Sequence, residues 1–290
     1  MGNLESIPVR VAGPGSQLQE SDAERLEFVS LPNEMSHYVA PDLPTPEQVR
    51  HLQGAKSVTD WLGQALTDYR VGGKPMIADI SGLDATNRDL VNQILGEGEV
   101  SLKYNDANTE VRMQESVLAG IWRTFYLDTV GQITRDFIEV CDVPVLARRT
   151  PSEASVDDLM RDTAPEGVMN ALPILTELQD RAAAWRSGSP SHVINLTLLP
   201  LSDGDNQFLD EVLGVGPVET LSRGYGDCNI ASTAYPGIWW VRYTNSMGTP
   251  ILDTLEVTEI PEVACAAQED LDDSRQRFRE LLEPYWTELA

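Results

Sequence analysis

The sequence predicts an α+β fold, a tandem duplication of one α-β-α-β-β-β-β unit with mostly antiparallel sheets. The first observation is that helical and strand-like apolar patterns occur twice in the same order. The second is that identical residues recur at a nearly constant spacing. Leu95-Gly96 matches Leu213-Gly214 at an offset of 118, and Gly120-Ile121-Trp122 matches Gly237-Ile238-Trp239 at an offset of 117. This offset changes across the first predicted hairpin tip, where insertions are best tolerated.

Each element is predicted from apolar periodicity and from the turn residues that bound it. The predicted helices of the first unit cover 57–69 and 84–95, and its strands cover 75–80, 100–104, 109–116, 120–127 and 132–139. The predicted helices of the second unit cover 172–187 and 203–213, and its strands cover 192–199, 218–222, 229–233, 238–244 and 251–257. The pattern leaves open whether the two units pack sheet to sheet or edge to edge.

The remaining segments complete the predicted domain organisation. Residues 1–55 form a proline-rich N-terminal arm, partly irregular, in which Thr45 caps a helix that has Pro46 at its first position. The first unit then covers 56–147, a polar linker with a short helix over 156–163 covers 148–170, and the second unit covers 171–290. A C-terminal helix over 269–289 carries an apolar stripe, and Pro284 should kink or end it. We expect this helix to pack on its own domain, with binding to a partner as the alternative.

Composition excludes several classes of protein. The net charge is −25, from 46 acids and 21 bases, and only Lys56, Lys74 and Lys103 are lysines. A nucleic-acid-binding protein needs a basic surface, which this composition does not supply. The sequence has no apolar run near the ~20 residues of a membrane span and no secretory signal pattern. The acidity has two explanations: a solubilising surface, or attraction to a basic segment of a partner.

The cysteines and histidines predict neither a disulfide scaffold nor a metal site. Cys141, Cys228 and Cys265 are odd in number and far apart, which is typical of a reducing compartment. The three histidines are also scattered, and the sequence contains no CxxC or HExxH pair. We therefore expect no cofactor. Phosphate-binding loops and G-x-S-x-G elbows are absent as well, so the sequence does not point to an enzyme.

The duplication separates shared scaffold from residues that one unit alone carries. Trp122 and Trp239 match, as do Tyr126 and Tyr243, so these are predicted core residues. The first hairpin tip, 105–108, reads NDAN and is an ordinary polar turn. Its counterpart in the second unit reads RGYGDC, and arginine with tyrosine is typical of protein-binding hot spots. The predicted partner-binding residues are Arg223, Gly224, Tyr225, Gly226, Asp227, Cys228 and Trp240.

Two points at this stretch stay open. Because Trp239 and Trp240 are adjacent in a strand, they should point to opposite faces of the sheet: one is core, and the other faces a helix, the other unit or a partner. Cys228 could alternatively be a redox-active or metal-binding thiol whose thiolate Arg223 stabilises. A small-molecule enzyme with a cleft between the units is a third, weaker hypothesis.

Several longer strings carry a family resemblance. They are IPVRVAGPGSQ at 7–17, LPNEMSHYVAPDLPTPE at 31–47, INLTLLPLS at 194–202, LSRGYGDCNI at 221–230 and the segment 239–274, which contains WWVRYTNSM and LDTLEVTEIPEV. On these strings the chain resembles the HupH/HyaF family of hydrogenase expression and formation proteins over nearly its whole length. Asp227 departs from the pattern, because asparagine is usual there.

The resemblance implies an accessory protein for the maturation of [NiFe] hydrogenases. Members are regarded as cytoplasmic chaperones that bind the iron–sulfur small subunit precursor before assembly and twin-arginine export, alongside a thioredoxin-like accessory protein. The family provides no catalytic residues to carry over. An acidic chain with an arginine- and tyrosine-bearing hairpin suits such a binding role.

Overall fold

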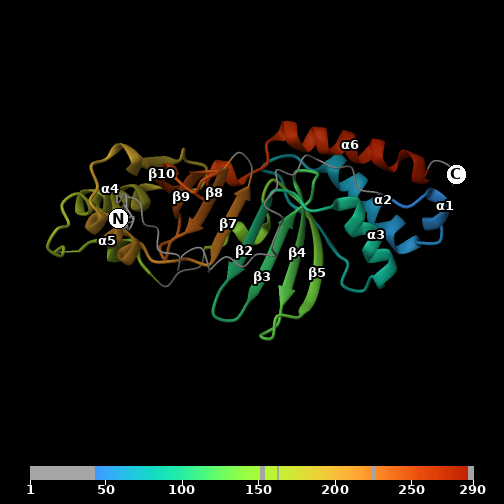
Figure 1. The fold of residues 1–290 in the computed structure, drawn as a ribbon, viewed down its shortest axis with the longest axis horizontal. Coiled ribbons are helices and arrows are strands. Elements are labelled where there is room, and N and C mark those ends of the chain that lie inside the picture. Colours follow the sequence, from blue (N-terminus) through green and yellow to red (C-terminus); the bar gives the residue numbers. More distant parts are fainter. Residues whose placement is uncertain (1–42, 151–153, 162, 224–225, 287–290) are drawn as a thin grey trace, which may run out of the picture. The chain divides into compact units, whose positions relative to one another are not determined.

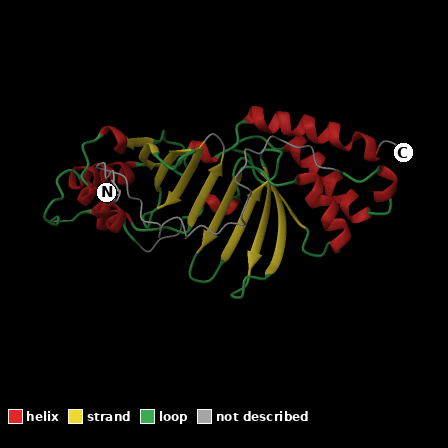
Figure 2. Ribbon diagram, viewed as in Figure 1, coloured by secondary structure: helices red, strands yellow, loops and turns green. Residues whose placement is uncertain are grey.

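The computed structural model describes residues 43–150, 154–161, 163–223 and 226–286. Over these residues ten strands form a single sheet in the order β1-β5-β4-β3-β2-β7-β8-β9-β10-β6, and every neighbouring pair is antiparallel (Figures 1 and 2). The predicted α+β fold and its duplication are confirmed. We call the part from α2 to β5 the first repeat and the part from α4 to β10 the second repeat.

The helices and strands are bounded as follows. The strands are β1 Met76–Asp79, β2 Val100–Asn105, β3 Glu110–Glu115, β4 Ile121–Leu127, β5 Ile133–Val140, β6 His192–Asn195, β7 Val218–Arg223, β8 Gly226–Ser232, β9 Ile238–Asn245 and β10 Pro250–Val257. The α-helices are α1 Pro46–Val49, α2 Gln53–Asp68, α3 Ala85–Leu95, α4 Ala171–Ala184, α5 Asp203–Leu213 and α6 Gln268–Trp286. Short 3₁₀ helices are η2 Val145–Arg148, η3 Val156–Leu159, η4 Leu196–Leu198 and η5 Glu262–Ala264. None of the helices in the described part of the chain combines the length and apolar character needed to cross a bilayer.

The two repeats join edge to edge through β2 and β7. Val100 pairs with Ser222, Leu102 with Thr220, and Tyr104 with Val218. Since the repeats are offset by 118 residues here, Leu102 and Thr220 are equivalent positions. The register is therefore that of a pseudo-two-fold axis passing between these two residues, as in a dimer that pairs through identical strands.

Several element boundaries differ from the prediction by a few residues, and two of these differences have causes that lie elsewhere in the fold. Helix α2 begins at Gln53 rather than at Ser57. The Asn87 side chain accepts a hydrogen bond from the Ala55 N–H at 2.7 Å, and this N–H group in the first turn would otherwise have no partner within the helix. Strand β6 ends at Asn195 rather than at Leu199. The Thr197 hydroxyl accepts the Asp253 N–H at 2.8 Å, which replaces the next ladder bond.

Helix α6 packs on the first repeat, although it follows the second in the chain. Its buried residues Leu271, Phe278 and Leu282 belong to one core cluster with residues of α1 and α2. The Tyr285 hydroxyl also donates to the Pro44 carbonyl at 2.8 Å. The expectation that this helix packs on its own domain is corrected: its apolar stripe is satisfied by the helices of the other repeat (Figure 1). The division of the chain at 55/56, 147/148 and 170/171 stays a prediction.

The core has two clusters. Trp122 and Trp239 are 1% and 0% exposed and lie in the first cluster, which also contains α2, α3 and α6 residues. Both were predicted to be core, and both are. The second cluster fills the space between the second repeat's strands and its helices α4 and α5. Trp240 lies in this second cluster, so the adjacent tryptophans do point to opposite faces of the sheet, and Trp240 faces helices.

Candidate partner-binding site

The β7–β8 hairpin is where the two repeats differ in length. Asn105 pairs with Glu110 in the first repeat, whereas Arg223 pairs with Asp227 in the second. Four residues therefore separate the paired ends in the first hairpin and three in the second. The change of offset falls at this tip, as the sequence predicted. Gly224 and Tyr225, two of the predicted site residues, lie outside the described residues.

Three predicted residues flank this tip. The Arg223 side chain is half-buried, and its backbone N–H donates to the Glu99 carbonyl at 3.1 Å, which ties the end of β7 to the first repeat. Asp227 is exposed across from it. Gly226 begins β8, and a Cβ built there would lie 2.1 Å from the Thr244 carbonyl oxygen. Glycine is therefore required at 226 by the close approach of β9.

Cys228 is buried in the sheet rather than exposed at the tip. It is 6% exposed and lies in the first core cluster, opposite Ser222 on one side and Tyr243 on the other. Burial raises the pKa of the Cys228 thiol, and this outweighs the lowering by the Tyr243 hydroxyl. The thiol is thus held in its neutral form at neutral pH, whereas the redox hypothesis needs a stabilised thiolate. Within the described residues, His, Cys, Asp and Glu form no group of three that could hold a metal ion.

Trp240 is also buried, on the opposite face. It is 7% exposed, and its indole N–H donates to the Asp253 carboxylate. The Arg242 guanidinium lies 4.0 Å from the indole ring centre and contacts the Asp253 carboxylate at 3.4 Å. The indole therefore belongs to the second core cluster and also contacts the ion pair between Arg242 and Asp253.

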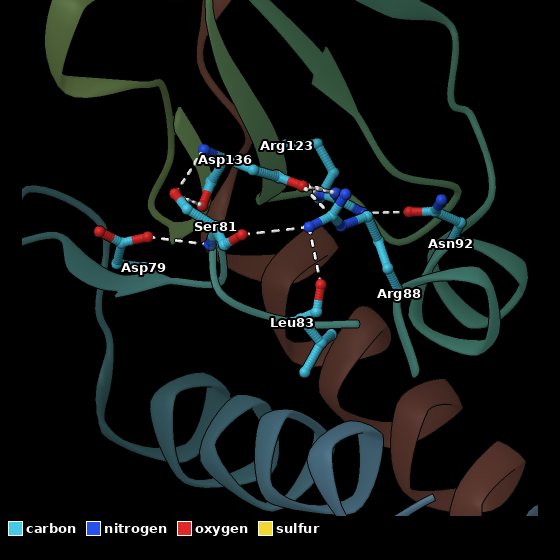
Figure 3. A network of polar contacts seen from close by, with 7 residues as sticks. All are labelled: Asp79, Ser81, Leu83, Arg88, Asn92, Arg123 and Asp136. Carbon is cyan, nitrogen blue, oxygen red and sulfur yellow. Dashed lines mark hydrogen bonds and ion pairs between the residues drawn. The ribbon is translucent and has the colours of Figure 1, made fainter. Parts of the chain in front are cut away.

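In the first repeat the matching position carries an arginine in place of the tryptophan, and Figure 3 shows its contacts. Arg123 occupies the place of Trp240 and donates three hydrogen bonds, 2.7, 2.8 and 3.3 Å long, to the buried carboxylate of Asp136. Arg123 also donates to Asn92 of α3, and the Asp136 N–H donates to the Ser81 hydroxyl at 2.9 Å. In both repeats, therefore, the side chain at this position donates to an aspartate of the neighbouring strand. Arg123 of β4 donates to Asp136 of β5, and Trp240 of β9 donates to Asp253 of β10. The comparison favours a scaffold role for Trp240.

The structure does not bring the predicted site residues together on one face. Arg223, Gly226 and Asp227 lie at the hairpin tip, while Cys228 and Trp240 are buried on opposite faces of the sheet. The residue alternation of a strand accounts for this, because Cys228 faces away from the side that carries Trp240.

Sequence reasoning missed a neighbouring surface. Gly226 pairs with Asn245, so the end of the β7–β8 hairpin lies beside the β9–β10 turn. In that turn the Asn245 side chain accepts hydrogen bonds from the Met247 and Thr249 N–H groups, both at 2.9 Å. Met247 is left 83% exposed. The signal was present in the string NSMGT, where a methionine stands inside an asparagine- and glycine-rich turn.

Comparison with known proteins now places the chain. The family described as "HupH hydrogenase expression protein, C-terminal conserved region" matches residues 52–161 and again residues 168–285, once over each repeat. Two similar relatives are named hydrogenase expression/formation proteins. HupQ of Azotobacter chroococcum is 45% identical to this chain, and the match covers 93% of this chain and 95% of HupQ. HoxQ of Cupriavidus necator is 45% identical, and the match covers 97% of this chain and 98% of HoxQ.

A more distant relative by sequence agrees with these. The hydrogenase-1 operon protein HyaF of Escherichia coli is 30% identical over 93% of both chains. A solved structure, the hydrogenase expression protein HupH from Thiobacillus denitrificans, is 30% identical with a TM-score of 0.36, covering 37% of this chain and 90% of its own. With the family matched on both repeats and relatives similar over nearly the full length, the chain belongs to the HupH family of hydrogenase expression proteins.

Proposed function

We propose that this chain is a cytoplasmic accessory protein in hydrogenase maturation. It acts as a chaperone that binds the iron–sulfur small subunit precursor before assembly and export, together with a thioredoxin-like accessory protein. The names of the relatives, hydrogenase expression/formation proteins, support the role in maturation. The small subunit as client and the location come from the family resemblance of the sequence.

The observation that carries the binding role is the pair of neighbouring ends, β7–β8 and β9–β10. They present Arg223 and Asp227 beside the exposed Met247, so charged groups and a large apolar side chain share one end of the second repeat. Arginine and methionine are both enriched at protein interfaces. In the first repeat the matching β2–β3 end is the polar turn 105–108, and Val130, which is 76% exposed, holds the position of Met247. The Arg223-bearing hairpin end, rather than the apolar turn residue, is therefore specific to the second repeat.

The binding role does not require catalysis. The buried polar residues described above are used to hold the sheet and the helices together: Arg123 and Asp136 bind each other, and Trp240 binds Asp253. We therefore propose a non-enzymatic protein. The Cys228 redox or metal-handling hypothesis is kept as the second candidate, although the burial and the raised pKa of this thiol weigh against it.

A capture experiment tests the site. The small-subunit precursor is immobilised and the purified full chain is passed over it, as wild type, as Arg223→Ala/Tyr225→Ala and as Met247→Ser. We expect each variant to reduce capture by about tenfold or more, the loss typical of a hot-spot residue. Asn108→Ala, at the tip of the first repeat, is the matched control and should bind like wild type. Unchanged capture by folded tip variants would remove the site assignment and leave the family membership intact.

A further inference from the structure

The connection between the edge strand and the second helix differs between the repeats. By sheet register, Ser81 of the first repeat is equivalent to Thr197 of the second, because their hydroxyls accept the N–H groups of Asp136 at 2.9 Å and Asp253 at 2.8 Å. The next equivalent pair is Asp84 and Ser202, whose side chains cap α3 and α5. Between these points the first repeat has Gly82-Leu83 and the second has Leu198-Leu199-Pro200-Leu201. The second repeat therefore has two additional residues in this loop.

The inserted residues are apolar and face outward. Leu198 is 79% exposed and Leu199 is 39% exposed. Strand β10 runs antiparallel to this segment, with Thr254 opposite Asn195 and Asp253 bonded to Thr197. Ile251, which is 59% exposed, precedes Asp253 and so lies at the same end of the sheet as the loop. We call Leu198, Leu199 and Ile251 the apolar loop surface. Core packing does not explain it, since the buried residue of this connection is Leu196.

The charge around the apolar loop surface has one dominant sign. Helix α5, which follows the loop, carries three exposed acids, Asp203, Asp210 and Glu211, and no basic residue, and the chain has no lysine after Lys103. Arg242 is paired with Asp210 at 3.1 Å and with Asp253 at 3.4 Å. Asp203, the first residue of α5, is exposed directly after the loop. An exposed apolar area inside an acidic surround attracts a ligand that is apolar and positively charged.

We propose that the apolar loop surface docks a partner segment that combines bulky apolar side chains with lysine or arginine. The apolar side chains cover Leu198, Leu199 and Ile251, and the basic groups face Asp203 and its acidic neighbours. Leu198 and Leu199 belong to the β6–α5 connection and not to the two hairpin ends that carry the proposed function, so altering these two leucines tests this surface independently of those ends.

The test uses a short synthetic peptide in which leucine pairs alternate with lysine pairs, and titrates it into the full chain by calorimetry. We expect Leu198→Ser/Leu199→Ser to weaken binding by about tenfold or more, since burying even part of two leucines contributes more than about 1.4 kcal/mol. The matched control is Val130→Ser/Ile133→Ser, which makes the same change at residues that are 76% and 59% exposed in the first repeat and should bind like wild type. All the altered residues are at the surface, and thermal unfolding verifies that each variant is folded.

Three outcomes would overturn the proposal. One is equal affinity for both serine variants. Another is unchanged binding of a peptide with glutamate in place of lysine, which would remove the charge requirement. The third is a wild-type dimer in sedimentation velocity that Leu198→Ser/Leu199→Ser converts to a monomer, which would assign the surface to a second copy of this chain.

Discussion

Leu102 of β2 lies directly opposite Thr220 of β7, and the two residues hold the same position in the two repeats. Both are buried, at 0% and 2% exposure. The strand that would be an exposed edge in an isolated repeat is therefore paired with its own counterpart, which removes two edges that would invite aggregation. The repeats share this ladder and one core cluster, so we expect them to unfold together.

Thr220→Val should stabilise the protein. Among the described residues the buried Thr220 hydroxyl has no hydrogen-bond partner, and a valine of the same shape occupies the site without an unpaired polar atom. We expect the free energy of unfolding in urea to rise by about 1 kcal/mol. Thr124→Val is the matched control, because that buried hydroxyl donates to Glu139 at 2.6 Å, and the change should lower stability. A loss of stability in both variants would contradict the interpretation of Thr220.

The joint at Leu102 and Thr220 also marks the limit of what the sequence could predict. Local patterns located most strands, the change of offset at the hairpin tip and the two matched core tryptophans, because each depends on neighbours in the chain. An alternating apolar pattern in β2 and β7 fits a sheet packed against another sheet equally well. The edge-to-edge pairing depends on hydrogen bonds between residues that are 114 to 122 positions apart, for which single-sequence periodicity carries no signal.

The same reasoning applies to α6 and Trp240. The apolar stripe of α6 predicts a helix that needs an apolar surface, and it does not specify which repeat supplies that surface. Strand alternation predicted that Trp240 and Trp239 face opposite sides, but what covers Trp240 depends on where α4 and α5 pack. The exposed Leu198 could be found only after the sheet register aligned Thr197 with Ser81.

Asp205→Ala should destabilise the second repeat strongly. This buried carboxylate accepts hydrogen bonds from the N–H groups of Met169, Asn170 and Ala171, at 2.8, 2.7 and 3.0 Å, and so caps α4. Its removal leaves several backbone donors unpaired, and we expect a loss of about 3 kcal/mol in urea unfolding. Asp205→Asn should cost less, because Asn87 holds the equivalent position in the first repeat and accepts the Ala55 N–H.

The same carboxylate predicts a direction for acid sensitivity. Burial acts to raise the pKa of Asp205, but hydrogen bonds from Ser202 and the backbone outweigh it and hold the pKa well below the ordinary value. A lowered folded-state pKa gives stability that is present above about pH 4 and lost as the pH falls below it. The stability difference between wild type and Asp205→Asn should therefore shrink on acidification. A difference that stays constant down to about pH 2 would contradict this assignment.

Glu115→Gln should gain stability over wild type as the pH rises. Burial raises the pKa of Glu115 to about 7, outweighing the hydrogen bond from the Gly120 N–H, and the carboxylates of Asp270 and Glu99 raise it further. The folded state therefore binds more protons than the unfolded state above about pH 4.5, so this contribution is complete at low pH and is lost as the pH rises through about 7. Glutamine stays neutral throughout and keeps an oxygen that can accept the Gly120 N–H.

We expect the advantage of Glu115→Gln over wild type to grow by about 1–2 kcal/mol between pH 5 and pH 8, measured by urea unfolding in buffers of equal ionic strength. Glu97→Gln makes the same charge change at an exposed position and serves as the control, with a difference that stays flat. A flat difference for Glu115→Gln as well would show that the carboxylate is solvated in solution.

Cys228 should resist alkylation in the folded protein. The thiol is 6% exposed, and burial raises its pKa, so both access and thiolate fraction are low. With iodoacetamide at pH 7, we expect modification of Cys228 to be on the order of 100-fold slower than in guanidinium chloride, followed residue by residue by mass spectrometry. Cys141, which is fully buried, is the internal reference for a structural cysteine. Fast labelling of Cys228 alone would favour the redox hypothesis. Cys228→Ala, which removes the sulfur and keeps a small apolar side chain, should then abolish hydrogenase maturation, whereas the chaperone proposal expects maturation to continue.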